Sequence, residues 1–458
     1  MMKKIAIITS VLFLLILSCT NHKNENKQYL ILSGTIENQN SDSLVLRNNM
    51  NKSIFTFHLT DGKFLDTLDI ENGFYSLFDG KEQTQVYLES NYNLNITLNT
   101  KEFDESVQYT GNGAGENNYM AKRALLDESF GNKIYYGYYA KLDESDFLKE
   151  SDSIYQQKKD LLNKYKKDIK EDFYNIELNN IKYSHLNRVS RYEGMKRYIT
   201  GNQEFKVSDN FPNAFKNIDL EDESLLKSES YDDFVETFIR ELTIKKTKDN
   251  ASLDYGVLFM EIADSVIKNG TIKEKIIYNT SVSGINYAKD IDKYYNKAKK
   301  LLIKKDYISE LTEKYTNLKK ISKGAISPDF ALKNIDGEMY TLDDFKGKYV
   351  YIDIWATWCM PCIKEIPYLK KIGKDYQNIQ FISICKSDKK ERWIKMVNEM
   401  ELEGIQLFAP DDNVDFFKKY MVQGIPRFIL IDKEGKIIDA NAERPSSPRL
   451  KEIFDHLQ

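Results

Sequence analysis

Two cysteines separated by two residues are the part of the chain best suited to chemistry. Cys359 and Cys362 flank Met360-Pro361 and directly follow an apolar run, residues 349–355. A strand that runs into a helix at this pair places Cys359 at the helix N-terminus, where free N–H groups and the helix dipole favour a thiolate. The thiolate is the form that attacks disulfides. We therefore expect an exposed, acidic Cys359 that forms a reversible disulfide with Cys362 and exchanges electrons with a partner's cysteines.

A Cys-x-x-Cys pair can also bind zinc or form a purely structural disulfide. Zinc takes four ligands, commonly from a second cysteine pair or from two histidines at short spacing. The chain has four Cys and four His, and only Cys385 and His456 lie in the same region as the pair. Neither forms a second ligand pair, so we expect no metal and no cofactor. Cys385 ends an apolar run, residues 380–385, which favours an inert buried thiol.

The residues around the pair predict alternating strands and helices. The turn signal Asn334-Ile335-Asp336-Gly337 predicts a hairpin. Residues 390–400 place Trp393, Met396, Val397 and Met400 on one helical face. Residues 429–431 and 437–438 read as a second hairpin, and Ser447-Pro448 as the cap and first residue of a C-terminal helix. This alternation predicts an α/β fold with a central sheet.

Four further features carry a family resemblance. Asp353 lies six residues before Cys359, while Glu365 and Pro367 follow Cys362 by three and five residues. Gly424-Ile425-Pro426 precedes another apolar run. Asp353 matches the buried carboxylate of thioredoxins. Glu365 and Pro367 match the acidic residue and the kinking proline of the active-site helix in TlpA-like proteins. Gly424-Ile425-Pro426 matches the cis-proline turn that faces the disulfide. Residues 321–458 therefore resemble the TlpA-like, membrane-anchored thiol–disulfide oxidoreductases of the thioredoxin superfamily.

Two carboxyl groups are candidates for moving a proton at this site. A carboxylate buried beside Cys362 would have a raised pKa, because burial penalises its charged form. It could then accept the proton of Cys362 as a general base. Asp353 and Glu365 both qualify and their titrations can be coupled, so the role is assigned to the pair. The alternative for Glu365 is an ordinary solvated residue of the helix.

The resemblance also implies a substrate-binding edge. A cis bond before Pro426 would hold the Ile425 backbone beside Cys359, where an extended substrate segment could pair with it as a strand. The alternative is an ordinary trans turn proline. Trp355 and Trp358 are expected to flank the disulfide, with Trp355 partly as packing and Trp358 as the rim.

The function that these expectations support is the reduction of disulfides in substrate proteins. Cys359 attacks the substrate disulfide, Cys362 resolves the mixed disulfide, and a membrane electron donor reduces the pair again. A disulfide oxidase or isomerase, or a thiol reductase in cytochrome c maturation, remains an alternative. A thiol peroxidase is less favoured, because Ile352 and Ala356 replace the Pro and Thr that peroxiredoxins carry. A mainly partner-binding envelope lipoprotein is the third class.

The N-terminus predicts export and a lipid anchor. Lys3-Lys4, the apolar residues 5–17 and Ile16-Leu17-Ser18-Cys19 resemble a bacterial lipoprotein signal peptide, which implies cleavage after residue 18 and a lipid on Cys19. Residues 19–28 read as a tether. The chain is expected in the bacterial cell envelope, facing the periplasm, with the outer membrane favoured. Only three cysteines follow Cys19, so the protein does not rely on structural disulfides in this oxidising compartment.

The remaining chain predicts two further domains, which gives a multidomain fold class. Residues 29–116 alternate like an antiparallel sheet and resemble the β-sandwich domain that precedes TlpA-like domains in Bacteroidetes lipoproteins. Residues 117–320 predict an α-helical region, with helical spacing behind the possible cap Ser230 and again over residues 291–302. The glycine-rich residues 111–115 read as a flexible turn between domains. The 66 basic and 70 acidic side chains give a net charge of −4, and nothing suggests nucleic-acid binding.

Overall fold

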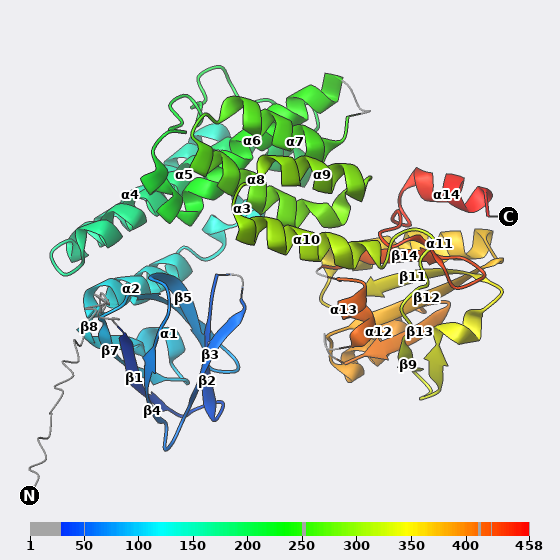
Figure 1. The fold of residues 1–458 in the computed structure, drawn as a ribbon, viewed down its shortest axis with the longest axis horizontal. Coiled ribbons are helices and arrows are strands. Elements are labelled where there is room, and N and C mark those ends of the chain that lie inside the picture. Colours follow the sequence, from blue (N-terminus) through cyan, green and yellow to red (C-terminus); the bar gives the residue numbers. More distant parts are fainter. Residues whose placement is uncertain (1–28, 50, 250–252, 411–413, 423, 458) are drawn as a thin grey trace, which may run out of the picture. The chain divides into compact units, whose positions relative to one another are not determined.

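The computed structural model describes residues 29–49, 51–249, 253–410, 414–422 and 424–457 (Figure 1). The predicted signal peptide (1–18), the tether (19–28) and the lipidated Cys19 lie outside these residues. Within the described part of the chain, no helix has the length and apolar character needed to cross a membrane. The chain divides into two compact units, Met1–Ala214 with Lys227–Tyr231, and Phe215–Leu226 with Asp232–Gln458.

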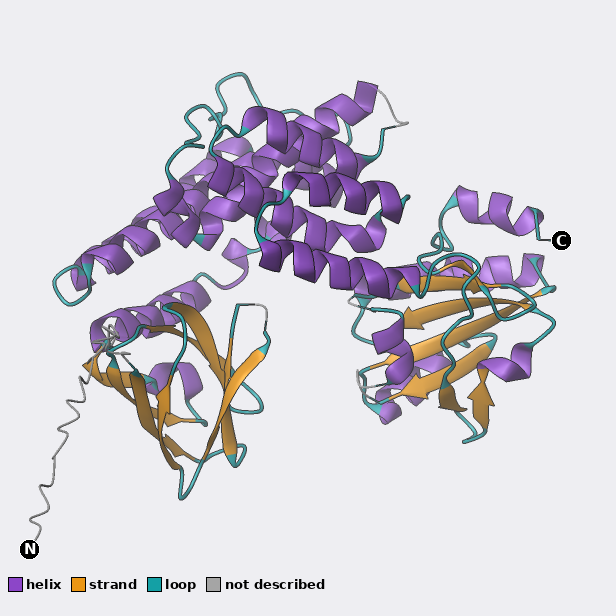
Figure 2. Cartoon of the chain, in the orientation of Figure 1, coloured by secondary structure: helices purple, strands orange, loops and turns teal. Residues whose placement is uncertain are grey.

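Two four-stranded sheets share one hydrophobic core in the first unit (Figure 2). In β7 (Asn93–Asn99), Leu94, Ile96 and Leu98 are buried while their neighbours are not, as the alternation predicts. The prediction of a wholly antiparallel sheet is wrong at one place, because β7 runs parallel to β1 (Leu30–Glu37). Alternation identifies the buried face of a strand but not the direction of its neighbour. The sheet orders are β4-β1-β7-β8 and β3-β2-β5-β6, and the other strands are β2 (Ser43–Arg47), β3 (Ser53–His58), β4 (Lys63–Leu68), β5 (Gly73–Phe78), β6 (Gln83–Leu88) and β8 (Gln108–Asn112).

Helices that follow residue 116 complete the core of these sheets. Tyr119, Leu162 and Phe173, from three different helices, belong to the same buried cluster as the strands. The Phe173 ring lies 4.8 Å from that of Tyr87 in β6 and 5.9 Å from that of Tyr119. The predicted boundary between residues 116 and 117 therefore does not coincide with a break between hydrophobic cores. The helices of this unit are α1 (Phe103–Ser106), α2 (Ala114–Ser129), α3 (Tyr136–Tyr139), α4 (Glu144–Tyr165) and α5 (Glu171–Thr200).

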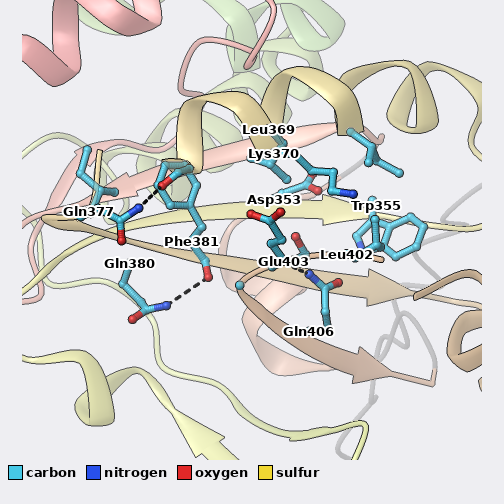
Figure 3. Close-up of a pocket in the computed structure, with 15 residues that line it drawn as sticks. Asp353, Trp355, Leu369, Lys370, Gln377, Gln380, Phe381, Leu402, Glu403 and Gln406 are labelled. Atoms are coloured by element: carbon cyan, nitrogen blue, oxygen red, sulfur yellow. Dashed lines mark hydrogen bonds between the residues drawn. The ribbon is translucent and has the colours of Figure 1, made fainter. Parts of the chain in front are cut away.

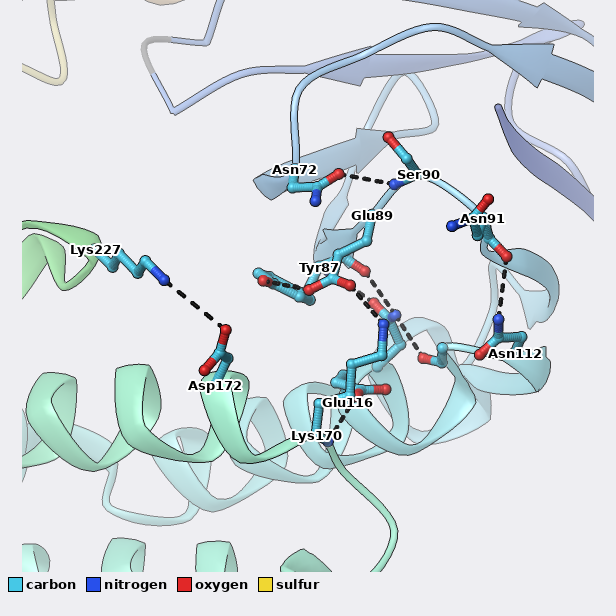
Figure 4. Close-up of polar contacts among 12 residues, drawn as sticks. Asn72, Tyr87, Glu89, Ser90, Asn91, Asn112, Glu116, Lys170, Asp172 and Lys227 are labelled. Carbon is cyan, nitrogen blue, oxygen red and sulfur yellow. Dashed lines mark hydrogen bonds and ion pairs between the residues drawn. The ribbon is translucent and has the colours of Figure 1, made fainter. Parts of the chain in front are cut away.

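Polar contacts fix the start of α5 against the sheets (Figure 4). The buried Glu116 of α2 accepts a hydrogen bond from the Lys170 amide at 2.9 Å, and the Lys170 ammonium lies 2.5 Å from Glu89 at the end of β6. The positive end of the α5 dipole also stabilises the Glu116 carboxylate at this position. Because α2, α5 and β6 meet at these contacts, the sheets and the long helices form one structural unit.

The glycine-rich residues 111–115 belong to this packing and are not a flexible turn between domains. Gly113 joins β8 to α2 with φ = 95°, a left-handed conformation that glycine adopts at little cost. Gly115 lies so close to the chain before α5 that a Cβ atom there would be 1.8 Å from the Asp168 carbonyl oxygen. The segment needs glycine because backbones approach each other closely.

Replacing Gly115 by Ala should therefore destabilise the first unit by about 1–3 kcal/mol through overpacking. Gly194→Ala in α5 is the matched control, since a Cβ atom there meets nothing within 4 Å. That variant should gain roughly 0.5–1 kcal/mol from helix propensity. Urea denaturation followed by far-UV circular dichroism measures both. Equal midpoints for the two variants would contradict the close approach at Gly115.

The second unit begins with five helices. Tyr294, Tyr295 and Ala298 are buried along α9 (Ile291–Leu301), which confirms the helix predicted over residues 291–302. The proposed cap Ser230 is wrong, because α6 (Glu229–Asp249) begins before it and the Tyr231 amide donates to the Ser228 hydroxyl. The other helices are α7 (Tyr255–Val266), α8 (Gly270–Gly284) and α10 (Lys305–Lys319).

A seven-stranded mixed sheet with the order β10-β9-β13-β12-β11-β14-β15 forms the rest of this unit. One of its interior strands, β11 (Tyr349–Trp355), runs parallel to β12 and antiparallel to β14, and all but its first residue are buried. Both predicted hairpins and the predicted helix at residues 390–400 are confirmed. The other elements are β9 (Ala331–Asn334), β10 (Met339–Thr341), β12 (Ile379–Lys386), β13 (Ile405–Ala409), β14 (Arg427–Ile431), β15 (Ile437–Asp439), α11 (Met360–Asp375), α12 (Lys390–Glu399), α13 (Asp415–Lys419) and α14 (Pro448–Asp455).

The segment that joins α10 to this sheet is itself attached to the sheet. Ala325 accepts a hydrogen bond from the Ile437 amide at 2.8 Å, and the Ser327 amide donates to Gly435 at 2.9 Å. Residues 324–327 therefore extend the β15 edge, and the break expected near residue 320 does not separate two compact units.

Candidate active site

The paired cysteines form a disulfide at the junction of β11 and α11. The Cα atoms of Cys359 and Cys362 lie 5.3 Å apart. Cys359 is the N-cap residue of α11, and its sulfur accepts the Cys362 amide at 3.3 Å. Pro361 lies in the first turn of the helix, where its missing N–H costs nothing. The predicted position of the pair at a helix N-terminus is confirmed.

Both sulfurs are more buried than the sequence suggests. Cys359 is 4% exposed and Cys362 is 3% exposed, so the expectation of an exposed Cys359 is wrong for this oxidised form. The disulfide belongs to a buried cluster that includes Trp355, Cys385 and Trp393. These neighbours come from β11, β12 and α12, and a local motif says nothing about how such distant segments cover it.

The two flanking tryptophans occupy different environments. Trp355 is only 1% exposed, which agrees with the packing role predicted for it, and its part in substrate binding stays a prediction. Trp358 is 57% exposed, and Met360, which the sequence analysis did not single out, is 61% exposed. The Trp358 indole N–H donates to the Ser387 carbonyl at 3.3 Å. Trp358 and Met360 therefore form an apolar rim beside the disulfide.

The turn before β14 has the predicted conformation. The Ile425–Pro426 peptide bond is cis. Ile425 is half-buried and packs against the cluster that contains the disulfide. A segment more than 60 residues away along the chain thus reaches the redox pair.

Asp353 is a buried carboxyl group in the middle of β11. It is 7% exposed and pairs in register with Ser383 of β12 on one side and Phe428 of β14 on the other. Burial raises the pKa of Asp353 to about 7; a hydrogen bond with Ser383 lowers it, and the charge of Glu365 raises it. Asp353 can therefore gain or lose a proton near neutral pH.

Asp353 also lines a cavity of about 260 Å³ (Figure 3). The walls come from β11, β12, α11, β13 and the chain just before β13, and they include the polar side chains of Ser383, Lys370 and Gln406. A polar cavity of this size can hold several water molecules. It gives the buried carboxyl a place to exchange protons away from the disulfide.

Glu365 lies one helical turn after Cys362 and is not a solvated helix residue. It is 9% exposed, and its carboxylate accepts two hydrogen bonds from Ser446, one from the amide and one from the hydroxyl, both at 2.9 Å. Pro367 follows within the same helix, as predicted. Ser446 was missed by the sequence analysis because 81 residues separate it from Glu365.

The third cysteine of the region is a buried free thiol, as predicted. Cys385 is fully buried, and burial followed by the charge of Asp388 raises its pKa. A raised pKa leaves it mostly as the unreactive thiol. Asp388 also accepts the Thr357 amide at 2.7 Å, which fixes the loop that leads into Cys359.

Replacing Asp353 by Asn should stabilise the oxidised protein, and the gain should depend on pH. An acid whose folded-state pKa is raised from 3.8 to about 7 loses stability as pH rises through that window, by roughly 4 kcal/mol at most. Asp353→Asn should therefore match the wild type near pH 4 and exceed it increasingly up to about pH 7. All three tryptophans lie in this region, so urea unfolding followed by tryptophan fluorescence isolates it. A gain that is equal at pH 4 and pH 8 would contradict the raised pKa.

Comparisons with known proteins agree with this chemistry. The family model described as Redoxin matches residues 322–455. Thiol-disulfide oxidoreductase ResA of Bacillus thuringiensis subsp. konkukian is 32% identical over 141 residues, which are 31% of this chain and 81% of that protein. Thioredoxin-like protein YneN of Bacillus subtilis is 31% identical over 141 residues, 30% of this chain and 80% of its own.

A crystal structure of the thioredoxin domain of a thiol-disulfide oxidoreductase from Bacteroides vulgatus is 30% identical and covers 30% of this chain and 97% of its own, with a TM-score of 0.28. The ResA relative is matched over most of its length, and the Redoxin match contains the disulfide, β11 and α11. This chain belongs to the thiol–disulfide oxidoreductase family.

Proposed function

We propose that this thiol–disulfide oxidoreductase works as a reductase of disulfides in envelope proteins, through a dithiol–disulfide cycle of Cys359 and Cys362. The observation that carries the proposal is the disulfide at the N-terminus of α11, with the Cys359 sulfur as its cap. In the reduced protein the same helix N-terminus favours the Cys359 thiolate, which is the attacking species.

The cycle needs two sulfur–sulfur exchanges. The Cys359 thiolate attacks the substrate disulfide, forms a mixed disulfide and releases one substrate thiolate. Cys362 then gives its proton to the Asp353 and Glu365 pair, attacks Cys359 and releases the second substrate thiolate. The substrate gains two electrons, and the Cys359–Cys362 pair loses two. A thiol donor at the membrane restores the dithiol.

The substrate segment would bind across the apolar rim. Trp358 and Met360 are exposed beside the disulfide, and Ile425 packs against the same cluster. The Ile425 and Pro426 backbone would pair with an extended segment that carries the substrate cysteine. Main-chain contacts and apolar burial require no particular substrate sequence. This arrangement would therefore accept many different protein substrates.

The protein would act at the envelope. Cys19 would carry the lipid after cleavage of residues 1–18, residues 19–28 would form the tether, and the chain would face the periplasm, with the outer membrane favoured. Residues 29–116 would supply the strands of a β-sandwich whose core is completed by α2, α4 and α5. Together with the other helices up to residue 320, this part would hold the redox domain, 321–458, near its partners. The shared core of the two N-terminal sheets supports the first of these assignments.

Replacing Cys359 by Ser should abolish reduction of insulin disulfides, because the attacking sulfur is lost. Cys362→Ala should accumulate a mixed disulfide at Cys359, visible by non-reducing electrophoresis and identified by mass spectrometry. Cys385→Ala is the matched control and should keep the activity, since that thiol is buried and unpaired with another cysteine. Full insulin-reducing activity of Cys359→Ser would contradict the proposed cycle. Faster oxidation of reduced substrates than reduction of oxidised ones would reverse its direction.

A further inference from the structure

The structure separates the two carboxyl groups that the cycle treats as a pair. Glu365 is held from outside its own helix, by the segment that precedes α14. The amide and the hydroxyl of Ser446 each donate to a different oxygen of the Glu365 carboxylate, both at 2.9 Å. A carboxylate accepts at both oxygens, whereas a carboxylic acid carries a proton on one of them. Two converging donors, one to each oxygen, therefore hold the Glu365 carboxyl group in one orientation.

The other groups that face Glu365 do not neutralise it. From β11 these are Asp353, whose pKa the charge of Glu365 raises, and Tyr351, which responds in the same way. Tyr351 is itself engaged, because its hydroxyl donates to the Glu443 carbonyl at 2.7 Å. Among the described residues, no lysine or arginine forms an ion pair with Glu365. The polar partners of the Glu365 carboxyl group are thus the amide and the hydroxyl of Ser446.

Asp353 has the opposite surroundings. It faces Ser383 in the middle of the sheet, and it lines the cavity that can take its proton to water. Glu365, by comparison, lies beneath the exposed Ser446 and does not line that cavity. One carboxyl is therefore placed to exchange a proton, and the other is tied in one position.

We propose that Ser446 is a positioning residue of the site, whose amide and hydroxyl hold the Glu365 carboxyl group in one place near Asp353. Asp353 is then the single group that takes the proton of Cys362. This inference rests on the proposed reductase cycle and assigns its proton step. As the Cys362–Cys359 bond forms, the bond from Cys359 to the substrate sulfur breaks, its electron pair leaves with the substrate thiolate, and the Cys362 proton ends on Asp353.

The test compares Ser446→Ala with Ser447→Ala, its neighbour, whose side chain makes no capping bond to α14. Ser446 is exposed, so neither change threatens the fold. The readout is the pKa of Asp353 in the oxidised full chain, from ¹³C NMR titration of labelled aspartate carboxyls. Glu365→Gln should lower it from about 7 by about one unit. Ser446→Ala removes the hydroxyl donor and keeps the amide donor, so it should lower the pKa of Asp353 by roughly half a unit, because the Glu365 carboxyl group is held less firmly. Ser447→Ala should leave it unchanged.

The opposite result is equally clear. If Ser446→Ala leaves the Asp353 titration where it is, or moves it upward, Ser446 does not position the charge. A shift of the same size in Ser447→Ala would also overturn the assignment, because the effect would then belong to the segment and not to the Ser446 hydroxyl.

A second measurement separates the two carboxyls in the proton step. The rate at which the mixed disulfide resolves should rise with pH through the titration of Asp353. Asp353→Asn should lose this rise, whereas Glu365→Gln and Ser446→Ala should keep it at a lower midpoint. Loss of the rise in Glu365→Gln but not in Asp353→Asn would overturn the assignment. The NMR titration needs no substrate, so it decides the role of Ser446 even if the wild type fails to reduce disulfides and the proposed function is abandoned.

Discussion

The start of α11 is the electrostatic feature on which the rest of the site depends. Free N–H groups and the helix dipole converge on Cys359, whose sulfur already accepts the Cys362 amide. Burial acts against this, because Cys359 is 4% exposed in the disulfide and a thiolate in the same position would lose most of its hydration. The site works as a redox centre only if the helix N-terminus outweighs that desolvation. The mixed sheet contributes by holding β11, and therefore the beginning of α11, rigidly in the middle of the fold.

The two buried acids, Asp353 and Glu365, have different electrostatic roles. Burial raises the pKa of Asp353 to about 7, and the cavity that Asp353 lines can relay its proton. Glu365 is close enough to raise the pKa of Asp353 and is held by two donors from the segment before α14. Charge, burial and proton access thus depend on β11, on the α11 helix that follows it, and on the distant segment before α14. Trp358 and Met360 leave an apolar rim exposed beside the buried disulfide.

The sequence predicts features that local chemistry determines. The position of Cys359 at a helix N-terminus and the two hairpins follow from motif spacing and turn signals. The buried Asp353 and the cis bond before Pro426 are implied by the family resemblance. Features set by distant contacts could not be predicted. The burial of Cys359 depends on Trp355 and Trp393, the hold on Glu365 depends on Ser446, and the parallel pairing of β1 with β7 depends on the chain connection between them. The core shared by β6, α2 and α5 likewise joins residues that alternation and helical spacing assign separately.

One measurement tests the central claim most directly. The reduced protein is alkylated with iodoacetamide over a range of pH, and the labelling of Cys359 and Cys362 is followed by mass spectrometry. The account predicts that Cys359 reacts as a thiolate well below the roughly 8.5 of free cysteine, while Cys362 does so only at higher pH. If both cysteines react only at or above that value, burial outweighs the helix N-terminus and the site cannot begin the exchange.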